Sequence, residues 1–315
     1  MNLFQRKKVV AAVLTLIVVV GAAALAYKPL LGLYRKAAKL PDDNGMYEID
    51  SNWFQVLEPV NESRADSFAA KLNSLKETYL TEQNRVFVAL VPDKGWYVKE
   101  EGYPTFEHLD FQQRAYGQLT DFVCIDLTDT LTLDSFFYTD RHWRQECLQP
   151  VLDKLGQAMD FSVQLDDFTQ NEVFPFEGDF SKYITGRMPE ESLFYLTNDA
   201  TEPAYVDNYQ APDVHTLYDL PQLEGQSPYN VFLSGITPIV TITNENASTD
   251  KELVIFRDSY ASSLAPLLCG EYRTITLIDL RFMHSSLLPE RITFTDQDVL
   301  FLYSDWIASN SSLIR

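Results

Sequence analysis

The clearest hydrophobic pattern in the chain is a run of nineteen uncharged residues from Val9 to Tyr27, VVAAVLTLIVVVGAAALAY. A helix of this length spans the ~30 Å hydrocarbon core of a bilayer. Arg6, Lys7 and Lys8 precede the run, and positive residues beside a membrane segment stay in the cytoplasm. The pattern predicts a single-pass protein of the cell membrane, with its N-terminus inside and the remainder extracytoplasmic.

A cleaved signal peptide is the alternative interpretation of the same run. Ala24-Leu25-Ala26 fits the small-residue cleavage pattern, which would give a protein secreted after cleavage near Ala26. The run is longer than a signal-peptide core of about 7 to 15 residues, and apolar Leu30, Leu31 and Leu33 follow it. These features favour an anchor.

The hydrophobic pattern of the remaining chain predicts an α/β domain. A helix is expected at residues 63–80, where apolar residues recur at spacings of four and three. Nearly continuous apolar runs, typical of strands buried on both faces, lie at residues 86–91, 122–127, 253–256, 274–278 and 299–303. Further helices are expected at residues 146–159 and 259–268, so we predict a mainly parallel sheet with helices on both sides.

These patterns divide the chain into an anchor and one large domain. Residues 1–8 form the predicted cytoplasmic tail, 9–27 the transmembrane helix and 28–60 a juxtamembrane segment and linker. Residues 61–315 form the predicted extracytoplasmic domain. Within it, residues 160–229 are rich in Asp, Pro, Tyr and Phe and lack clear periodicity, so they are interpreted as an insertion that either shapes a substrate groove or is irregular decoration.

The charge distribution excludes nucleic acid as a partner. Seven of the 25 Lys and Arg residues and none of the 45 Asp and Glu residues lie in residues 1–39, so residues 40–315 carry 18 minus 45, a net charge of −27. Such a surface repels a polyanion, and its simplest role is to keep the domain soluble.

Neither cysteine nor histidine spacing indicates a metal site. Cys124, Cys147 and Cys269 are too few for a disulfide framework and are interpreted as buried apolar residues, although one disulfide with one free thiol stays open. We expect no metal and no cofactor.

Two segments carry the candidate chemistry, TDRHW at residues 139–143 and LVIFRDSYASS at residues 253–263. Ser259 follows a predicted strand and begins a helix, at the sheet edge where open α/β proteins bind ligands. His142 is the candidate base that would activate its hydroxyl. Asp140, two residues earlier, could orient the imidazole and stabilise its charged form.

A purely structural interpretation competes with this triad. A serine between strand and helix is commonly a helix N-cap, and Asp258 could cap the same helix. Ser262 and Ser263 are weaker alternative nucleophiles because both fall inside the predicted helix.

The sequence resembles the DHHW family of bacterial exported proteins in these two segments. The family signature is close to Y-x-T-D-H-H-W followed by K-D-S-Y-A-N-S, and three further segments match in order: Val91-Pro92-Asp93-Lys94, SPYNVFLSG at 227–235 and Ile278-Asp279-Leu280-Arg281. That family is similar to the SGNH-hydrolase-like domains of alginate O-acetyltransferases. The resemblance implies an SGNH-hydrolase-like three-layer domain with Ser259 as nucleophile, His142 as base and Asp140 as its orienting acid.

The sequence departs from the family pattern at the positions around this triad. Arg141 replaces the first His of the signature, and Ile236 stands where relatives often have an Asn that could stabilise an oxyanion. The remaining oxyanion donors would be the N–H groups of Ser259 and Gly235.

Three further residues are candidates for contact with the substrate, namely Trp143, Tyr260 and Arg281. Arg281 could instead pair with a nearby carboxylate such as Asp279, and this structural pairing is favoured.

The expected function is that of an extracytoplasmic serine-dependent O-acyl (acetyl) transferase or esterase acting on an envelope or extracellular glycan. By analogy with the alginate system, a membrane-bound O-acyltransferase is the expected partner. The alternative is a catalytically silent glycan-binding or scaffold protein with the same fold.

Overall fold

The computed structural model describes residues 27, 30–184 and 187–315. The predicted cytoplasmic tail and, apart from Tyr27, the predicted transmembrane helix at residues 9–27 lie outside these residues. Within the described ranges, no helix is both long and apolar enough to cross a membrane.

The domain is built on a seven-stranded sheet with the order β4-β3-β11-β9-β10-β8-β7. The first five strands in this order pair in parallel, whereas β8 pairs antiparallel to β10 and to β7. The prediction of a mainly parallel sheet is therefore confirmed. The strands are β3 (Arg85–Val91), β4 (Val123–Asp126), β7 (Tyr205–Asn208), β8 (Ile239–Thr243), β9 (Glu252–Arg257), β10 (Thr274–Ile278) and β11 (Asp298–Ser304).

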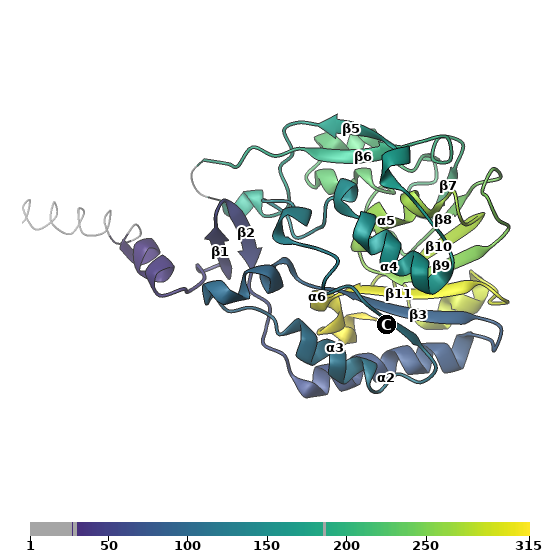
Figure 1. The fold of residues 1–315 in the computed structure, drawn as a ribbon, viewed down its shortest axis with the longest axis horizontal. Helices are drawn as coiled ribbons and strands as arrows, with labels where there is room; N and C mark the ends of the chain where they lie inside the picture. The colour runs from purple at the N-terminus through teal and green to yellow at the C-terminus, as the bar shows by residue number, and fades with distance from the viewer. Residues whose placement is uncertain (1–26, 28–29, 185–186) are drawn as a thin grey trace, which may run out of the picture.

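Helices cover both faces of this sheet, which gives three layers (Figure 1). On one face α2 (Glu62–Tyr79) and α3 (His108–Tyr116) pack through Phe68 and Phe111. On the other face α4 (Gln149–Met159) and α5 (Tyr260–Leu268) pack through residues such as Leu155 and Leu264. A short helix, α6 (Asp305–Ala308), follows β11.

Burial on both faces explains why the central strands lack an alternating pattern. All residues of β11 are buried; its odd-numbered apolar residues, such as Phe301, face α2 and its even-numbered ones, such as Leu302, face α5. Phe301 stacks on Phe256 of β9 with ring centroids 4.7 Å apart. The sheet therefore has a separate hydrophobic core on each face.

Short 3₁₀ helices make up much of the remaining chain. They cover Lys94–Glu101, Leu133–Ser135, Gln145–Cys147, Leu165–Asp167, Ser181–Tyr183, Leu220–Glu224, Pro228–Val231, Ser285–Glu290 and Ser311–Leu313. The helix predicted at residues 146–159 is thus split into a 3₁₀ turn and α4, with Pro150 in the first turn of α4, where proline is tolerated.

The segment predicted as a linker, residues 28–60, folds in part onto the domain. It contains an antiparallel hairpin of β1 (Met46–Ile49) and β2 (Asn52–Gln55). Tyr47 and Phe54 of the hairpin are buried, and Tyr47 stacks on Tyr103 at 4.4 Å. The sequence pattern did not indicate this hairpin.

The region predicted as an insertion, residues 160–229, is tied closely to the domain. It holds a two-stranded antiparallel sheet of β5 (Thr169–Val173) and β6 (Leu193–Thr197), and it supplies the edge strand β7 of the main sheet.

The interpretation of all three cysteines as buried residues is wrong for Cys124. This side chain is exposed, Cys147 is half-buried and only Cys269 is buried; all three are free thiols. Cys124 lies on β4, an edge strand in which only Ile125 is buried.

The two-sided core predicts a strong contrast between two apolar strand residues. Truncating Phe301 to Ala should lower the free energy of unfolding by about 3–5 kcal/mol, because it leaves a cavity at the centre of the sheet. Val123→Ala on β4, where Val123 is 49% exposed, should change it by less than about 0.5 kcal/mol. Urea unfolding followed by circular dichroism measures both; equal effects would contradict this packing.

Candidate active site

Ser259 lies where β9 passes into α5, at the carboxyl edge of the parallel strands. The side chain of Ser259 does not cap α5. The helix start is instead held by Asp258, whose carboxylate accepts hydrogen bonds from the N–H of Tyr260 (3.1 Å) and from the N–H and hydroxyl of Ser304 (2.7 and 2.6 Å). Because Asp258 does the capping, the Ser259 hydroxyl is available for another partner.

That partner is His142. The distance between His142 Nε2 and Ser259 Oγ is 2.7 Å, and the distance between His142 Nδ1 and Asp140 Oδ1 is 2.6 Å. The three side chains singled out from the sequence thus form one hydrogen-bonded chain. An imidazole held between a carboxylate and a hydroxyl is the arrangement that activates a serine nucleophile.

The Asp140 carboxylate is buried and its two oxygens have separate partners. Oδ1 accepts from the ring and the backbone N–H of His142, and Oδ2 accepts from the Asp179 N–H at 2.8 Å. Burial opposes the ionised form, but the charge of His142 and these hydrogen bonds outweigh it, so the pKa of Asp140 is lowered well below its ordinary value. Asp140 is therefore a stable anion.

The loop that carries Asp140 is fixed by two buried charged residues. Lys94 Nζ donates to the carbonyl oxygens of Phe137 (2.6 Å) and Asp140 (3.1 Å). Glu191 accepts from the backbone N–H groups of Tyr138 (2.6 Å) and Thr139 (2.8 Å). Lys94 thus satisfies carbonyl groups of the loop, and Glu191 satisfies its N–H groups.

Gly178 allows the predicted insertion to approach this loop. A Cβ atom at Gly178 would lie 2.5 Å from both Asp140 Cβ and the Thr139 carbonyl oxygen. The Gly178 N–H donates to Thr139 Oγ1 (2.8 Å), and the Phe180 N–H donates to the Thr139 carbonyl (2.9 Å). Residues 178–180 therefore hold the acid of the triad in place.

Tyr229 supports the histidine and was not predicted as a site residue. Its ring stacks on the His142 imidazole with centroids 3.8 Å apart and planes 8° apart, and its hydroxyl lies 2.8 Å from Ser263 Oγ. The only sequence signal was its place in the SPYNVFLSG segment.

The three residues predicted to contact substrate each have a structural partner. Trp143 is fully buried, and its indole N–H donates to Ser263 Oγ at 2.8 Å. Tyr260 is buried and donates to the Arg141 carbonyl at 2.7 Å. Arg281 forms a two-pronged pair with Asp279 (2.8 and 2.6 Å), the pairing favoured from the sequence.

Gly235, predicted as an oxyanion donor, uses its N–H in a turn. It donates to the Phe232 carbonyl at 3.1 Å, so of the two predicted donors only the Ser259 N–H is left. Ile236 is 52% exposed and projects into solvent. The Asn230 side chain lies beside Gly235, with Oδ1 2.3 Å from the position that a Cβ at Gly235 would take.

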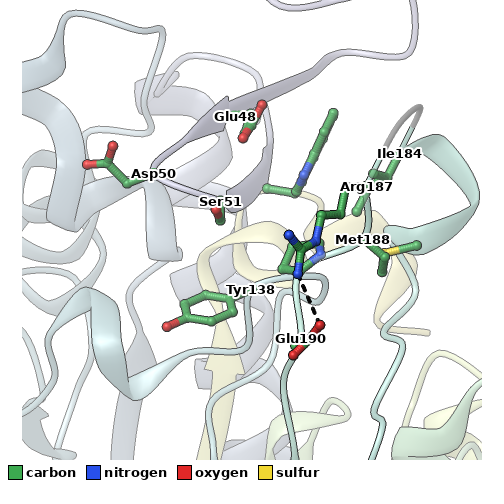
Figure 2. A pocket seen from close by; sticks show the side chains of 10 residues that line it. Glu48, Asp50, Ser51, Tyr138, Ile184, Arg187, Met188 and Glu190 are labelled. Carbon is green, nitrogen blue, oxygen red and sulfur yellow. Dashed lines mark hydrogen bonds and ion pairs between the residues drawn. The ribbon is translucent and has the colours of Figure 1, made fainter.

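A pocket of about 600 Å³ opens beside the loop of Asp140 (Figure 2). Trp53 and Tyr138 line it together with polar residues. The backbone N–H of Trp53 donates to the backbone carbonyl of Tyr138 at 2.8 Å. Arg187 and Glu190 form an ion pair on its wall. None of the triad residues lines this pocket, although Tyr138 is two residues from Asp140.

The described residues contain no group of three or more His, Cys, Asp or Glu side chains that could hold a metal ion. Of the histidines outside the triad, His108 is buried against Asp305 (2.8 Å) and His284 hydrogen-bonds Ser286 (2.9 Å).

Comparison with known proteins gives matches in structure. No family model and no curated protein sequence matches the chain. A DHHW family protein from Eubacterium siraeum is similar over 87% of this chain and 95% of its own, with a TM-score of 0.72 and 20% identity. PatB1 of Bacillus cereus is similar over 84% of this chain and 96% of its own (TM-score 0.67, 16% identity).

The O-acetyltransferase domain of Pseudomonas putida AlgJ is also similar, over 84% of this chain and 92% of its own, with a TM-score of 0.51 and 12% identity. At these identities the likeness concerns the fold. The chain has a mixed α/β fold with a mainly parallel sheet, and this fold is similar to those of the DHHW family protein, PatB1 and the AlgJ domain.

Proposed function

We propose that the protein is a serine-dependent O-acyl transferase or esterase that carries acetyl groups and acts on an envelope or extracellular glycan. The observation that carries the proposal is the hydrogen-bonded chain from Asp140 through His142 to Ser259, at the sheet edge where the Ser259 hydroxyl is free of its helix.

The reaction would proceed in two halves. Ser259 Oγ attacks the carbonyl carbon of an acetyl donor while His142 Nε2 takes the hydroxyl proton. The bond to the donor's leaving oxygen breaks, His142 returns the proton to that oxygen, and Ser259 is left as an acetyl ester. A sugar hydroxyl or water then attacks this ester, passing its proton through His142 back to Ser259 Oγ.

Electrostatics support this sequence of proton transfers. The lowered pKa of Asp140 keeps its carboxylate ionised beside an imidazole that becomes positively charged in each half-reaction. The negative oxygen of the tetrahedral intermediate would lie near the Ser259 N–H at the start of α5, and the Asn230 carboxamide beside Gly235 is a further candidate donor.

Acetyl transfer to an oxygen atom is supported by one similar structure, which is named an O-acetyltransferase domain. A glycan acceptor is supported by the pocket beside Tyr138. This pocket combines two aromatic side chains with carboxylates and an arginine, groups that can contact the faces and the hydroxyls of a sugar.

Localisation and partners form part of the proposal. The run at residues 9–27 would anchor the domain outside the cytoplasm, and a membrane-bound O-acyltransferase would supply the acetyl group. A silent glycan-binding protein is the alternative, favoured by Ile236 at the usual Asn position; the assembled triad favours the enzyme.

The central test is acetylation of Ser259. The full-length protein, treated with p-nitrophenyl acetate, should release p-nitrophenol and gain the mass of one acetyl group on the peptide that contains Ser259. Ser259→Ala should abolish both. Ser286→Ala is the matched control, since Ser286 also bonds a histidine but on the exposed surface. Equal labelling of the wild type and Ser259→Ala would exclude this nucleophile.

Replacing Asp140 by Asn should lower ester turnover by about 10³- to 10⁴-fold, because an amide neither stabilises the imidazolium nor selects the correct tautomer. The pKa of Asp140 is lower in the folded protein than in the unfolded chain. Asp140 therefore stabilises the fold at pH values above its pKa in the unfolded chain, and this stabilisation is lost as the pH falls through its pKa in the folded protein. Steady-state kinetics measure the first effect and acid unfolding the second. Near-normal turnover by Asp140→Asn would remove Asp140 from the mechanism.

Gly178→Ala should lower turnover by about 10²-fold, because the added methyl group displaces Asp140. Gly32→Ala is the control, since a Cβ at Gly32 would meet no atom within 4 Å. Kinetics with p-nitrophenyl acetate, together with thermal unfolding to separate misfolding from misplacement, measure the effect. If a folded Gly178→Ala protein turns over normally, the close approach is unimportant for the triad.

A further inference from the structure

Arg141 stands between the acid and the base of the triad sequence, and its side chain points away from both. The guanidinium lies over the Trp306 ring at 4.9 Å and near the Phe180 ring at 5.5 Å. One terminal nitrogen donates to Gln55 Oε1 at 2.6 Å. Two aromatic rings and an amide therefore hold the charged group in one place.

Arg141 has no carboxylate partner among the described residues, unlike two other arginines, Arg144 and Arg281. Arg144 pairs with Glu191 at 3.4 Å and Arg281 with Asp279 at 2.6 Å, whereas none of the ion pairs among the described residues includes Arg141. Acidic residues outnumber basic ones by 45 to 25 in this chain. An arginine left without a carboxylate is therefore unexpected on electrostatic grounds alone.

Asp93 is an acidic residue that feels the charge of Arg141, but its carboxylate is hydrogen-bonded to another group. The Arg141 charge acts on Asp93, but Asp93 Oδ1 accepts from the Gly95 N–H at 2.8 Å and no ion pair joins the two side chains. Burial raises the pKa of Asp93 to about 6. Arg141 is half-buried, and its nitrogens are not among the buried unpartnered atoms of the described chain, so its free N–H groups reach solvent.

Trp306 brings this cation to the edge of the sheet that carries Ser259. It is the second residue of α6, directly after β11, and β11 is the neighbour of β9. The Ser304 N–H donates to Asp258, the residue before Ser259. Trp306 is 38% exposed, so part of its ring is open to a ligand.

We propose that Arg141 and Trp306 form an anion-recognition subsite beside Ser259, in which the guanidinium binds a carboxylate or phosphate on the acceptor glycan and the exposed indole contacts the adjoining sugar. The identity of the acceptor as a glycan rests on the proposed function. The planar guanidinium matches either anion with two parallel hydrogen bonds. The subsite selects anionic acceptors locally, since the domain's overall negative charge is screened beyond about 8 Å at physiological salt.

The test is binding to the full-length Ser259→Ala protein, measured by isothermal titration calorimetry without turnover. The carboxylate arm compares tetragalacturonate with its fully methyl-esterified form, which has the same skeleton and no charge. The phosphate arm compares a glycerol phosphate tetramer with tetraglycerol. We expect one anionic tetramer to bind about tenfold more tightly than its uncharged partner, the gain of a single well-placed charge-assisted pair.

Variants assign that preference to Arg141. Adding Arg141→Gln should remove the preference, and Arg141→Lys should retain part of it. Arg273→Gln, which removes the same charge at the opposite edge of the sheet just before β10, should retain all of it. A preference that survives in a folded Arg141→Gln protein, or no preference in either arm, would overturn the subsite.

The two proposals fail in different ways. If Ser259 is acetylated but charge does not affect binding, only the subsite is wrong. If Ser259 is never acetylated but the anionic tetramer binds through Arg141, the subsite stands in a binding protein and the enzymatic proposal is wrong.

Discussion

The geometry of the site depends on the hydrogen bonds that the Asp258 carboxylate accepts. It accepts hydrogen bonds from the start of α5 and from the end of β11, so it fixes a helix and a strand to each other and satisfies a helix terminus that a serine side chain would otherwise cap. Ser259 is thereby left with an uncommitted hydroxyl. Without Asp258, helix capping and bonding to His142 would compete for the same oxygen.

A second constraint is that the triad acid lies on an irregular loop, which has no hydrogen-bond ladder of its own. Lys94, Glu191 and the backbone of residues 178–180 supply the missing partners. Removing two buried charges from water is costly unless each has several partners, and here each has at least two. These hydrogen bonds fix the loop, and with it the direction in which the Asp140 carboxylate points toward His142.

The sequence indicated those parts of the fold and site that depend on local patterns. Continuous apolar runs revealed the central strands because both faces of each are buried. The Asp-x-His spacing and the strand-to-helix position of Ser259 made the triad a candidate, and the resemblance to the DHHW family favoured it over a helix cap. Tyr229 and Gly178 contact the triad from more than 30 residues away along the chain, and no local pattern marks such contacts. The hairpin β1–β2 was missed because each strand has only four residues and because Tyr47 packs on Tyr103, which is distant along the chain. Cys124 was misjudged because an edge strand looks like a central one in sequence.

The hairpin also determines where the N-terminal segment joins the domain. Its strand β2 bonds to the Tyr138 backbone and, through Gln55, to Arg141. The segment that leads to the N-terminus therefore joins the domain at a hairpin that contacts the loop of Asp140. An anchor on the N-terminal side of this hairpin would join the domain close to the site. The proposed anchor at residues 9–27 would therefore restrict the orientation of the site as well as its distance from the membrane.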